Sequence, residues 1–214
     1  LFRKALEWKK ASVDPTRNIK KFKENNTVQV ILKPEEVKRL IEEASPEIKP
    51  IITIAINTGM RRGEILALKW KNIDFIKGNI EIEDSKSGKS RKVPMNSTVY
   101  ELFKGMNKDY EFIFYNPKTK THIKDVKRSF NTAREKAGLK KIRFHDLRHT
   151  FATRLCEIGV PLKVVSKILG HSTIQMTERY ANPTPDSMKE AVESLSDVLK
   201  TRQKVDTSQI LPGK

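Results

Sequence analysis

The sequence predicts an α+β domain that is mainly helical and contains one small antiparallel sheet of three strands. Three observations favour this fold class. Apolar residues recur at intervals of three and four along most of the chain, as on helices with one buried face. Alternation is confined to residues 75–94, where two turn-forming segments separate three short runs. A hydrophobic content of 37% in 214 residues suffices for one core plus an appendage.

Residues 1–33 predict the end of a helix followed by a basic linker. Leu1, Ala5 and Trp8 are spaced as on an amphipathic helix, and a polar run without periodicity follows Asp14. The segment holds nine Lys or Arg residues against three Asp or Glu residues. We expect it to lie along a polyanion, and a basic tail that contacts nothing is the alternative. Because the chain begins without Met, we also expect a fragment of a longer protein.

A globular domain is predicted to begin at Pro34, which suits the first position of a helix. The nearly all-apolar helix at 51–59 should be buried at the centre of this domain. Arg61, Arg62 and Glu64 then lead into another helix. A helix start attracts anions and an arginine adds a forked donor, so the two arginines are candidate phosphate ligands. A structural ion pair with Glu64 is the alternative.

The three strands are expected at 75–76, at 80–82 and at 91–94, joined by turns at 77–79 and 85–90. The second turn carries Lys86 and Lys89. These lysines could contact a phosphate, although exposed lysines that contact nothing are common.

Helices are also predicted after Ser97 and from Val126 to Gly138, with a short buried segment at 112–114. The exposed face of the helix that ends at Gly138 is basic and suits a DNA backbone, with plain solubilisation as the alternative.

The segment from Phe144 to Tyr180 concentrates the candidate reactive side chains. His145 and Arg148 stand three residues apart near the start of an apolar helix and share a face. A second helix ends at Gly170, so that His171 lies in a turn. Ser172 with the glutamine three residues later resembles a capping box for a third short helix, which leads to Tyr180.

A final amphipathic helix is predicted within residues 185–200, after a hinge at 182–185. This helix could pack on its own domain or on a neighbouring subunit. We expect residues 201–214 to fray.

The net charge of +17 and the pI of about 9.9 favour a polyanionic partner, with nucleic acid as the first candidate. A thermophile-like charged surface would raise both signs and leaves this excess unexplained. Cys156 is the only cysteine, which excludes an internal disulfide and a cysteine metal cluster and fits a reducing cytoplasm. The sequence shows neither a membrane-spanning apolar run nor a signal peptide at its start.

The candidate residues suit cleavage of a phosphodiester. Two arginines and a histidine, such as Arg61, Arg148 and His171, can stabilise the negative charge that builds on the phosphate oxygens without a metal. A base and an acid must move protons, and a tyrosine hydroxyl can act as a covalent nucleophile.

Other chemistries fit less well. His145 and His149 could hold zinc, but no glutamate completes an HExxH pattern. Neither a phosphate-binding GxxxxGK[ST] loop nor a GxSxG nucleophile motif occurs. A helix pair that binds DNA without chemistry remains an alternative.

Four segments in this order, TGMRRGEILAL, SKSGKSRKVP, HDLRHTFAT and LGHSTIQMTERY, resemble the catalytic domain of the tyrosine recombinases, which include phage and transposon integrases and Xer-type enzymes. The resemblance implies the tyrosine-recombinase catalytic-domain fold. It implies three segments: 1–33 as the end of a core-binding domain and an interdomain linker, 34–200 as the catalytic domain, and 201–214 as a flexible tail.

The resemblance also implies the site. The residues expected to carry the reaction are Arg61, Lys86, His145, Arg148, His171 and Tyr180. The arginines would clamp the scissile phosphate, Lys86 would protonate the 5′ oxygen, and the two histidines would assist as general base and phosphate hydrogen-bond donor. The expected supporting residues are Glu64, Asp146 and His149. The expected DNA contacts are Lys20, Lys21, Lys23, Lys89, Arg91, Lys127 and Arg128.

The implied function is that of a site-specific DNA recombinase, an integrase that works through a 3′-phosphotyrosyl intermediate with neither metal nor nucleotide cofactor. Its partner would be double-stranded DNA, on which a homotetramer would form by exchange of the C-terminal helix, with a monomer in the absence of DNA and no membrane association. A non-catalytic DNA-binding module, Xer-type chromosome or plasmid resolution, and a relaxing topoisomerase-like enzyme are the alternatives.

Overall fold

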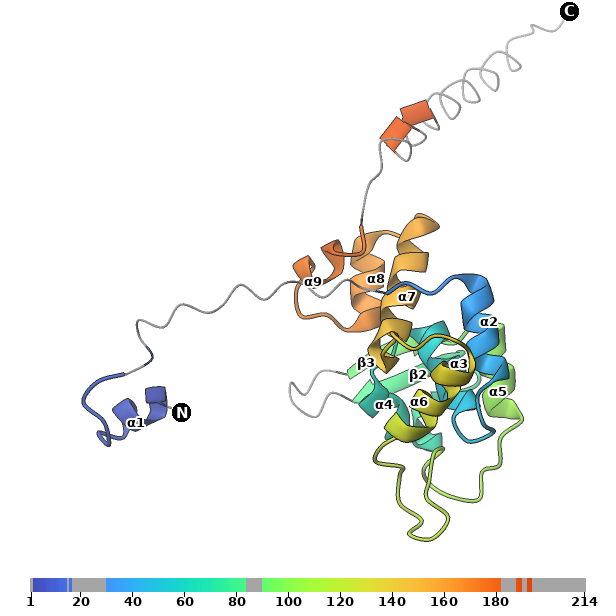
Figure 1. Cartoon of the computed structure of the whole chain (residues 1–214), viewed down its shortest axis with the longest axis horizontal. Coiled ribbons are helices and arrows are strands. Elements are labelled where there is room, and N and C mark those ends of the chain that lie inside the picture. The colour runs from blue at the N-terminus through green and yellow to red at the C-terminus, as the bar shows by residue number, and fades with distance from the viewer. Residues whose placement is uncertain are drawn as a thin grey trace, which may run out of the picture.

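The computed structural model describes residues 2–14, 16, 30–83, 90–181, 188–189 and 192–193 (Figure 1). Its elements in chain order are α1 (Phe2–Glu7), α2 (Pro34–Glu42), α3 (Lys49–Thr58), α4 (Arg62–Leu66), the 3₁₀ turn η1 (Trp70–Asn72), β1 (Ile73–Asp74), β2 (Asn79–Glu83), β3 (Ser90–Pro94), α5 (Ser97–Lys104), α6 (Lys127–Lys136), α7 (Phe144–Glu157), α8 (Leu162–Leu169) and α9 (Gln175–Glu178). The mainly helical fold with one small sheet is confirmed.

Helix α3 occupies the centre of the core, as its sequence predicts. Ile51, Ile52 and Ile54 are fully buried, because α2, α4, α5 and α7 all pack against this helix. The helix ends at Gly59, which adopts a left-handed conformation with φ of 63°. Helices that are apolar on all sides are stable only in such an enclosed position.

The sheet has the order β1-β2-β3 with antiparallel pairing throughout. Ile80 and Ile82 of β2 point into the core, and the alternate residues face outward. The prediction of a first strand at 75–76 is wrong, because β1 lies at Ile73–Asp74 and residues 75–78 form a turn in which Ile76 is 97% exposed. The Asp74 carboxylate instead accepts hydrogen bonds from the backbone N–H groups of Ile76 and Lys77, which makes this segment a turn.

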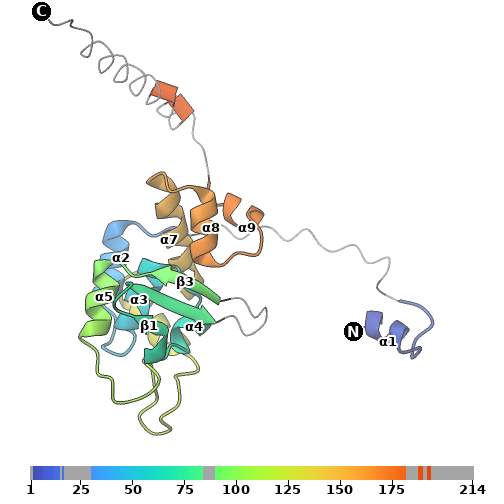
Figure 2. The same cartoon turned by 180° about the vertical axis from the view of Figure 1, so that it is seen from behind.

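Helices α7, α8 and α9 form one end of the body (Figure 1), and β3 packs against α8, as seen from behind in Figure 2. A small apolar cluster of Ala152, Val165, Leu169 and Tyr180 lies between these helices. The chain entering α2 is fixed across α7, because Thr150 Oγ1 accepts a hydrogen bond from the Leu32 N–H and Arg154 donates to the Leu32 carbonyl.

The predicted C-terminal helix is described at residues 188–189 and 192–193, which are helical. The predicted hinge at 182–185 and the tail at 201–214 lie outside the described residues. Within the described part of the chain, no helix combines the length and the apolar character needed to cross a membrane.

Candidate active site

The C-terminal end of α8 binds three arginine side chains, one on each of three successive carbonyl groups. The bonds are Arg91 Nε to the Ile168 carbonyl at 3.2 Å, Arg148 Nη2 to the Leu169 carbonyl at 2.8 Å, and Arg61 Nη2 to the Gly170 carbonyl at 3.4 Å. The last carbonyls of a helix lack partners within it and form the negative end of its dipole. Helix α8 therefore gathers cations from three separate segments of the chain.

Arg148 is the most enclosed of these cations, with only 3% of its surface exposed. Its Nη1 donates a second hydrogen bond, at 2.6 Å, to the Gly59 carbonyl at the end of α3. Burial and the nearby charge of Arg61 lower the pKa of Arg148 to about 10. A phosphate bound here would stabilise the charged guanidinium groups of Arg148 and Arg61, because a nearby anion favours the charged form of a guanidinium.

Glu64 fixes two of the arginines. Its carboxylate accepts two hydrogen bonds from Arg91, at 2.9 Å and 2.6 Å, and further bonds from the backbone N–H and Nη1 of Arg61. Burial raises the pKa of Glu64, but the hydrogen bonds from Arg91 and Arg61 outweigh it and hold the pKa below its usual value. Glu64 is thus an anion that supports the cationic site.

The two adjacent arginines have different partners. Arg61 contacts Glu64 and the end of α8, whereas Arg62 pairs with Asp125 at 3.0 Å. A cavity of about 340 Å³ opens beside them. Its lining residues are Met60, Arg62, Arg143, Phe144, His145 and Arg148. His145 and Arg148 therefore face a space that can hold a phosphate.

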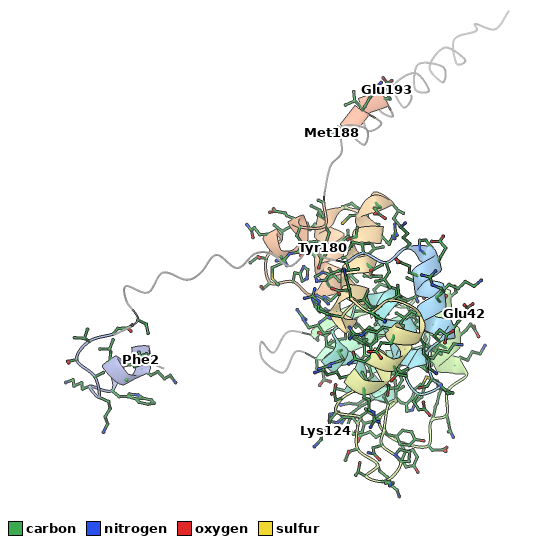
Figure 3. The ribbon with its side chains drawn as sticks, in the orientation of Figure 1. Phe2, Glu42, Lys124, Tyr180, Met188 and Glu193 are labelled. Atoms are coloured by element: carbon green, nitrogen blue, oxygen red, sulfur yellow. The ribbon has the colours of Figure 1, made fainter. Side chains whose placement is uncertain are left out.

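Tyr180 lies at the α7–α9 end of the body, away from Lys124 (Figure 3). Its ring packs on Ala152 and Leu169 and only 6% of the residue is exposed. The hydroxyl oxygen is 2.7 Å from His149 Nδ1. Burial raises the pKa of Tyr180 above its usual value, although the charge of Arg148 acts in the opposite direction. The side chain is therefore a neutral phenol near neutral pH.

Two histidines, His149 and His171, contact this tyrosine, and a third, His145, contacts His149. The ring of His149 meets that of His145 edge to face, with centroids 4.6 Å apart, and the ring of His171 stacks on Tyr180 at 6.4 Å. His171 Nδ1 is bonded to Thr177 Oγ1 at 2.8 Å. Desolvation is the main reason why the pKa values of His149 and His171 fall to about 4, and it also lowers that of His145. Near neutral pH these rings are therefore uncharged.

Asp146 supports the start of α7. It is completely buried and accepts hydrogen bonds from the backbone N–H of Arg143 at 2.7 Å and from Arg143 Nη2 at 2.8 Å. This arrangement caps the first turn of the helix that carries His145, Arg148 and His149.

The remaining predicted residues fall into two groups. Lys20, Lys21, Lys23, Lys86 and Lys89 lie outside the described residues. Lys127 and Arg128 are exposed at the start of α6. Arg91, which the sequence predicts as a DNA contact, has a side chain that is only 15% exposed and is bound to Glu64 and to the Ile168 carbonyl. Its contact with DNA stays a prediction.

Two contacts were not foreseen from the sequence, the bond between Tyr180 and His149 and the pairing of Glu64 with Arg91. Both join segments that are distant in the chain. The described residues contain no cluster of three or more His, Cys, Asp or Glu side chains arranged to hold a metal ion.

Residues 31–186 match the phage integrase family. The integrase of Salmonella phage P22 is 32% identical over 185 residues, which cover 79% of this chain and 48% of the phage protein. The tyrosine recombinase XerA of Pyrococcus furiosus is 32% identical over 178 residues, which cover 78% of this chain and 62% of XerA. The chain thus spans from about half to three-fifths of the length of these relatives.

Solved structures show the same fold. The catalytic domain of bacteriophage HP1 integrase aligns with a TM-score of 0.61 and 30% identity, covering 77% of this chain and 94% of that domain. The site-specific recombinase XerH, bound to its difH substrate, aligns with a TM-score of 0.63 and 25% identity, covering 76% of this chain and 53% of XerH.

Proposed function

Because the chain belongs to the phage integrase family, we propose that it is the catalytic part of a site-specific DNA recombinase. Tyr180 attacks a DNA phosphate and forms a 3′-phosphotyrosyl intermediate, which later transfers the strand to a new 5′ hydroxyl. The observation that carries this proposal is the placement of the buried Tyr180 hydroxyl on His149, within the field of the buried Arg148. A structural tyrosine has no need of such a cationic setting.

The phosphate is held by Arg61 and Arg148. Both guanidinium groups are fixed by backbone carbonyls, and Arg148 lines the adjacent cavity. Prepositioned donors stabilise the charge that develops on the phosphate oxygens and typically contribute about 10²-fold to 10³-fold each. His171 adds a hydrogen bond through its Nε2, because its Nδ1 is bonded to Thr177. His145, which lines the same cavity, assists at the phosphate.

The Tyr180 oxygen forms a bond to phosphorus while the bond from phosphorus to the 5′ oxygen breaks. The phenolic proton passes to a base, and the departing 5′ oxygen takes a proton from Lys86, which lies outside the described residues. The phosphotyrosyl bond conserves the energy of the broken bond, so rejoining needs no nucleotide.

Double-stranded DNA is the proposed substrate. The charge of +17 and the likeness to XerH, which is bound to its difH DNA, support this assignment. We assign residues 34–200 to the catalytic domain, since 77% of the chain aligns with 94% of an integrase catalytic domain. Lys127 and Arg128 are proposed contacts to the DNA backbone.

We assign assembly to the C-terminal helix. Met188 and Val192 lie four residues apart in helical backbone and are 54% and 71% exposed, which suits docking on a neighbouring subunit. A homotetramer on DNA and a monomer without DNA are expected, and light scattering with and without bound duplex measures both.

The covalent intermediate can be trapped with a library of nicked suicide duplexes of randomised sequence. We expect the protein to form a DNA adduct that survives denaturing electrophoresis, also in the presence of EDTA, and Tyr180→Phe to form none. Tyr115→Phe, which changes a tyrosine in the segment that pairs with His122, is the matched control and should react normally. Binding that depends on salt but never yields an adduct would instead identify a non-catalytic DNA-binding module.

A further inference from the structure

We propose that His149, rather than His145, accepts the phenolic proton of Tyr180 during attack on the DNA. This inference rests on the proposed function, because it assigns the proton transfer within that reaction. It gives a catalytic role to a residue whose expected role was support.

The geometry favours His149. Its Nδ1 is 2.7 Å from the Tyr180 hydroxyl, and both residues are only 6% exposed. A general base must lie within about 2.6–3.2 Å of the group that it deprotonates. His145 contacts the ring of His149 edge to face, and His171 presents its ring face to Tyr180. Among the described residues, the hydrogen-bonding partner of the tyrosine hydroxyl is therefore His149.

Packing explains why the second of the two α7 histidines meets the tyrosine. The Tyr180 ring lies in the apolar cluster with Ala152 of α7 and Val165 of α8. His149 precedes Ala152 by three residues and shares its side of the helix, whereas His145 lies one further turn toward the N-terminus. The tautomer with its proton on Nε2 leaves Nδ1 free to accept the phenolic proton.

Burial of this pair keeps the nucleophile in its neutral form before DNA binds. Desolvation, then the neighbouring His145, lower the pKa of His149 to about 4, and burial raises the pKa of Tyr180. Among the described residues, the charged or titratable groups that face the pair include His145, Asp146, Arg143, Arg148, Cys156, Arg179 and His171. In this state the proton stays on the tyrosine.

DNA binding changes this balance. A phosphodiester placed on Arg61 and Arg148 brings negative charge into a site whose neighbours are mostly cationic. Negative charge near an imidazole stabilises its protonated form and so raises its pKa. His149 becomes a stronger base when the substrate arrives. As the bond from the tyrosine oxygen to phosphorus forms and the 5′ oxygen leaves, the proton passes to Nδ1, and the reverse step returns it to the tyrosine.

The test measures the single-turnover rate of adduct formation by the intact chain between pH 5.5 and 9. The substrate is a suicide duplex that formed an adduct in the library experiment. The variant His149→Asn keeps a hydrogen-bond acceptor near the position of Nδ1 but cannot take a proton. We expect a nearly flat profile for the unchanged protein above pH 6. We expect His149→Asn to be at least about 100-fold slower at pH 7 and to gain about tenfold in rate per pH unit, because the tyrosine must then lose its proton to solvent.

Two matched substitutions locate the effect. His145→Asn makes the same change one helical turn away and should lower the rate without making it rise with pH. His122→Asn, in the segment paired with Tyr115, should leave both rate and profile unchanged. A flat profile in His149→Asn, or a rising one in His145→Asn, would overturn the assignment.

A second variant guards against a purely structural effect. In His149→Ala, added imidazole should restore adduct formation in proportion to its concentration, and a structural role would give no such rescue. The unchanged protein separates the two proposals. If the unchanged protein forms no adduct, the proposed function is wrong. If it forms the adduct, but the rate of His149→Asn does not rise with pH and imidazole does not rescue His149→Ala, only the proposed role of His149 is wrong.

Discussion

Glu64 binds Arg91 through both carboxylate oxygens, at 2.9 Å and 2.6 Å, and so ties α4 to β3. The same carboxylate holds Arg61, and Arg91 in turn reaches the carbonyl of Ile168 in α8. One acidic side chain thus connects three elements around the proposed phosphate site. Planar two-bond pairing of this kind fixes orientation as well as charge.

Replacing Glu64 with Gln should destabilise the fold by about 2 kcal/mol at pH 7, because it leaves the largely buried Arg91 and the half-exposed Arg61 without this countercharge. The folded pKa of Glu64 lies below its usual value, so its contribution is present above the unfolded pKa and is lost as the pH falls through the folded value. The difference in the free energy of unfolding between the unchanged protein and Glu64→Gln should therefore become smaller toward pH 3.5. Urea unfolding at both pH values measures it, and Glu111→Gln, which changes an exposed pair with Lys69, should shift stability by less than about 0.5 kcal/mol.

The two adjacent arginines should respond differently to substitution. Arg61→Ala removes a proposed phosphate ligand and should slow adduct formation by about 100-fold or more. Arg62→Ala removes an exposed pair with Asp125 and should have a much smaller effect on the rate. Single-turnover rates on the same duplex compare them, and a larger loss in Arg62→Ala would exchange their assigned roles.

Stability should fall as the pH decreases from 6.5 toward 4. The folded pKa of His149 is about 4, below its unfolded value of 6.5, so the unfolded chain binds the proton first. A shift of this size corresponds to at most about 3 kcal/mol, since each pKa unit is worth about 1.4 kcal/mol. His149→Gln should be less stable at pH 7.5, and its deficit should shrink at pH 4.5.

Gly59 should tolerate alanine far less well than Gly138. Both have positive φ, 63° and 73°, but a Cβ on Gly59 would lie 2.4 Å from Phe151 Cδ1, whereas one on Gly138 meets nothing within 4 Å. We expect Gly138→Ala to cost about 1 kcal/mol and Gly59→Ala about 3 kcal/mol. Gly59→Ala should also slow adduct formation, because the displaced carbonyl holds Arg148. Equal losses of stability in the two variants would contradict the role of this close packing.

The sequence predicts those features that follow from local periodicity. The buried α3, the three-stranded sheet and the α7–α8 pair all appear in the structure, because their apolar spacing and terminal glycines select one local conformation. Two element boundaries were predicted wrongly from the sequence, those of the first strand and of α9. The Asp74 carboxylate turns the chain where a strand was expected, and Ile174 rather than Ser172 precedes the first residue of α9.

The site was only partly predictable for a different reason. Motif spacing brings Arg61, Arg148 and Tyr180 into one proposal, but it does not indicate which histidine meets the tyrosine. That choice depends on how the chain after α9 packs against α7. The pairing of Arg91 with Glu64 was not predictable either, because the two residues are 27 positions apart in the chain and no local pattern links them.

The three arginines at the end of α8 set a limit on the length of that helix. Each added residue turns an α-helix by about 100° and lengthens it by about 1.5 Å. A single insertion or deletion within α8 would therefore carry the carbonyls of Ile168, Leu169 and Gly170 away from all three guanidinium groups at once. Substitutions on the outer surface of α8 should be accepted readily, while its residue count should be intolerant of change.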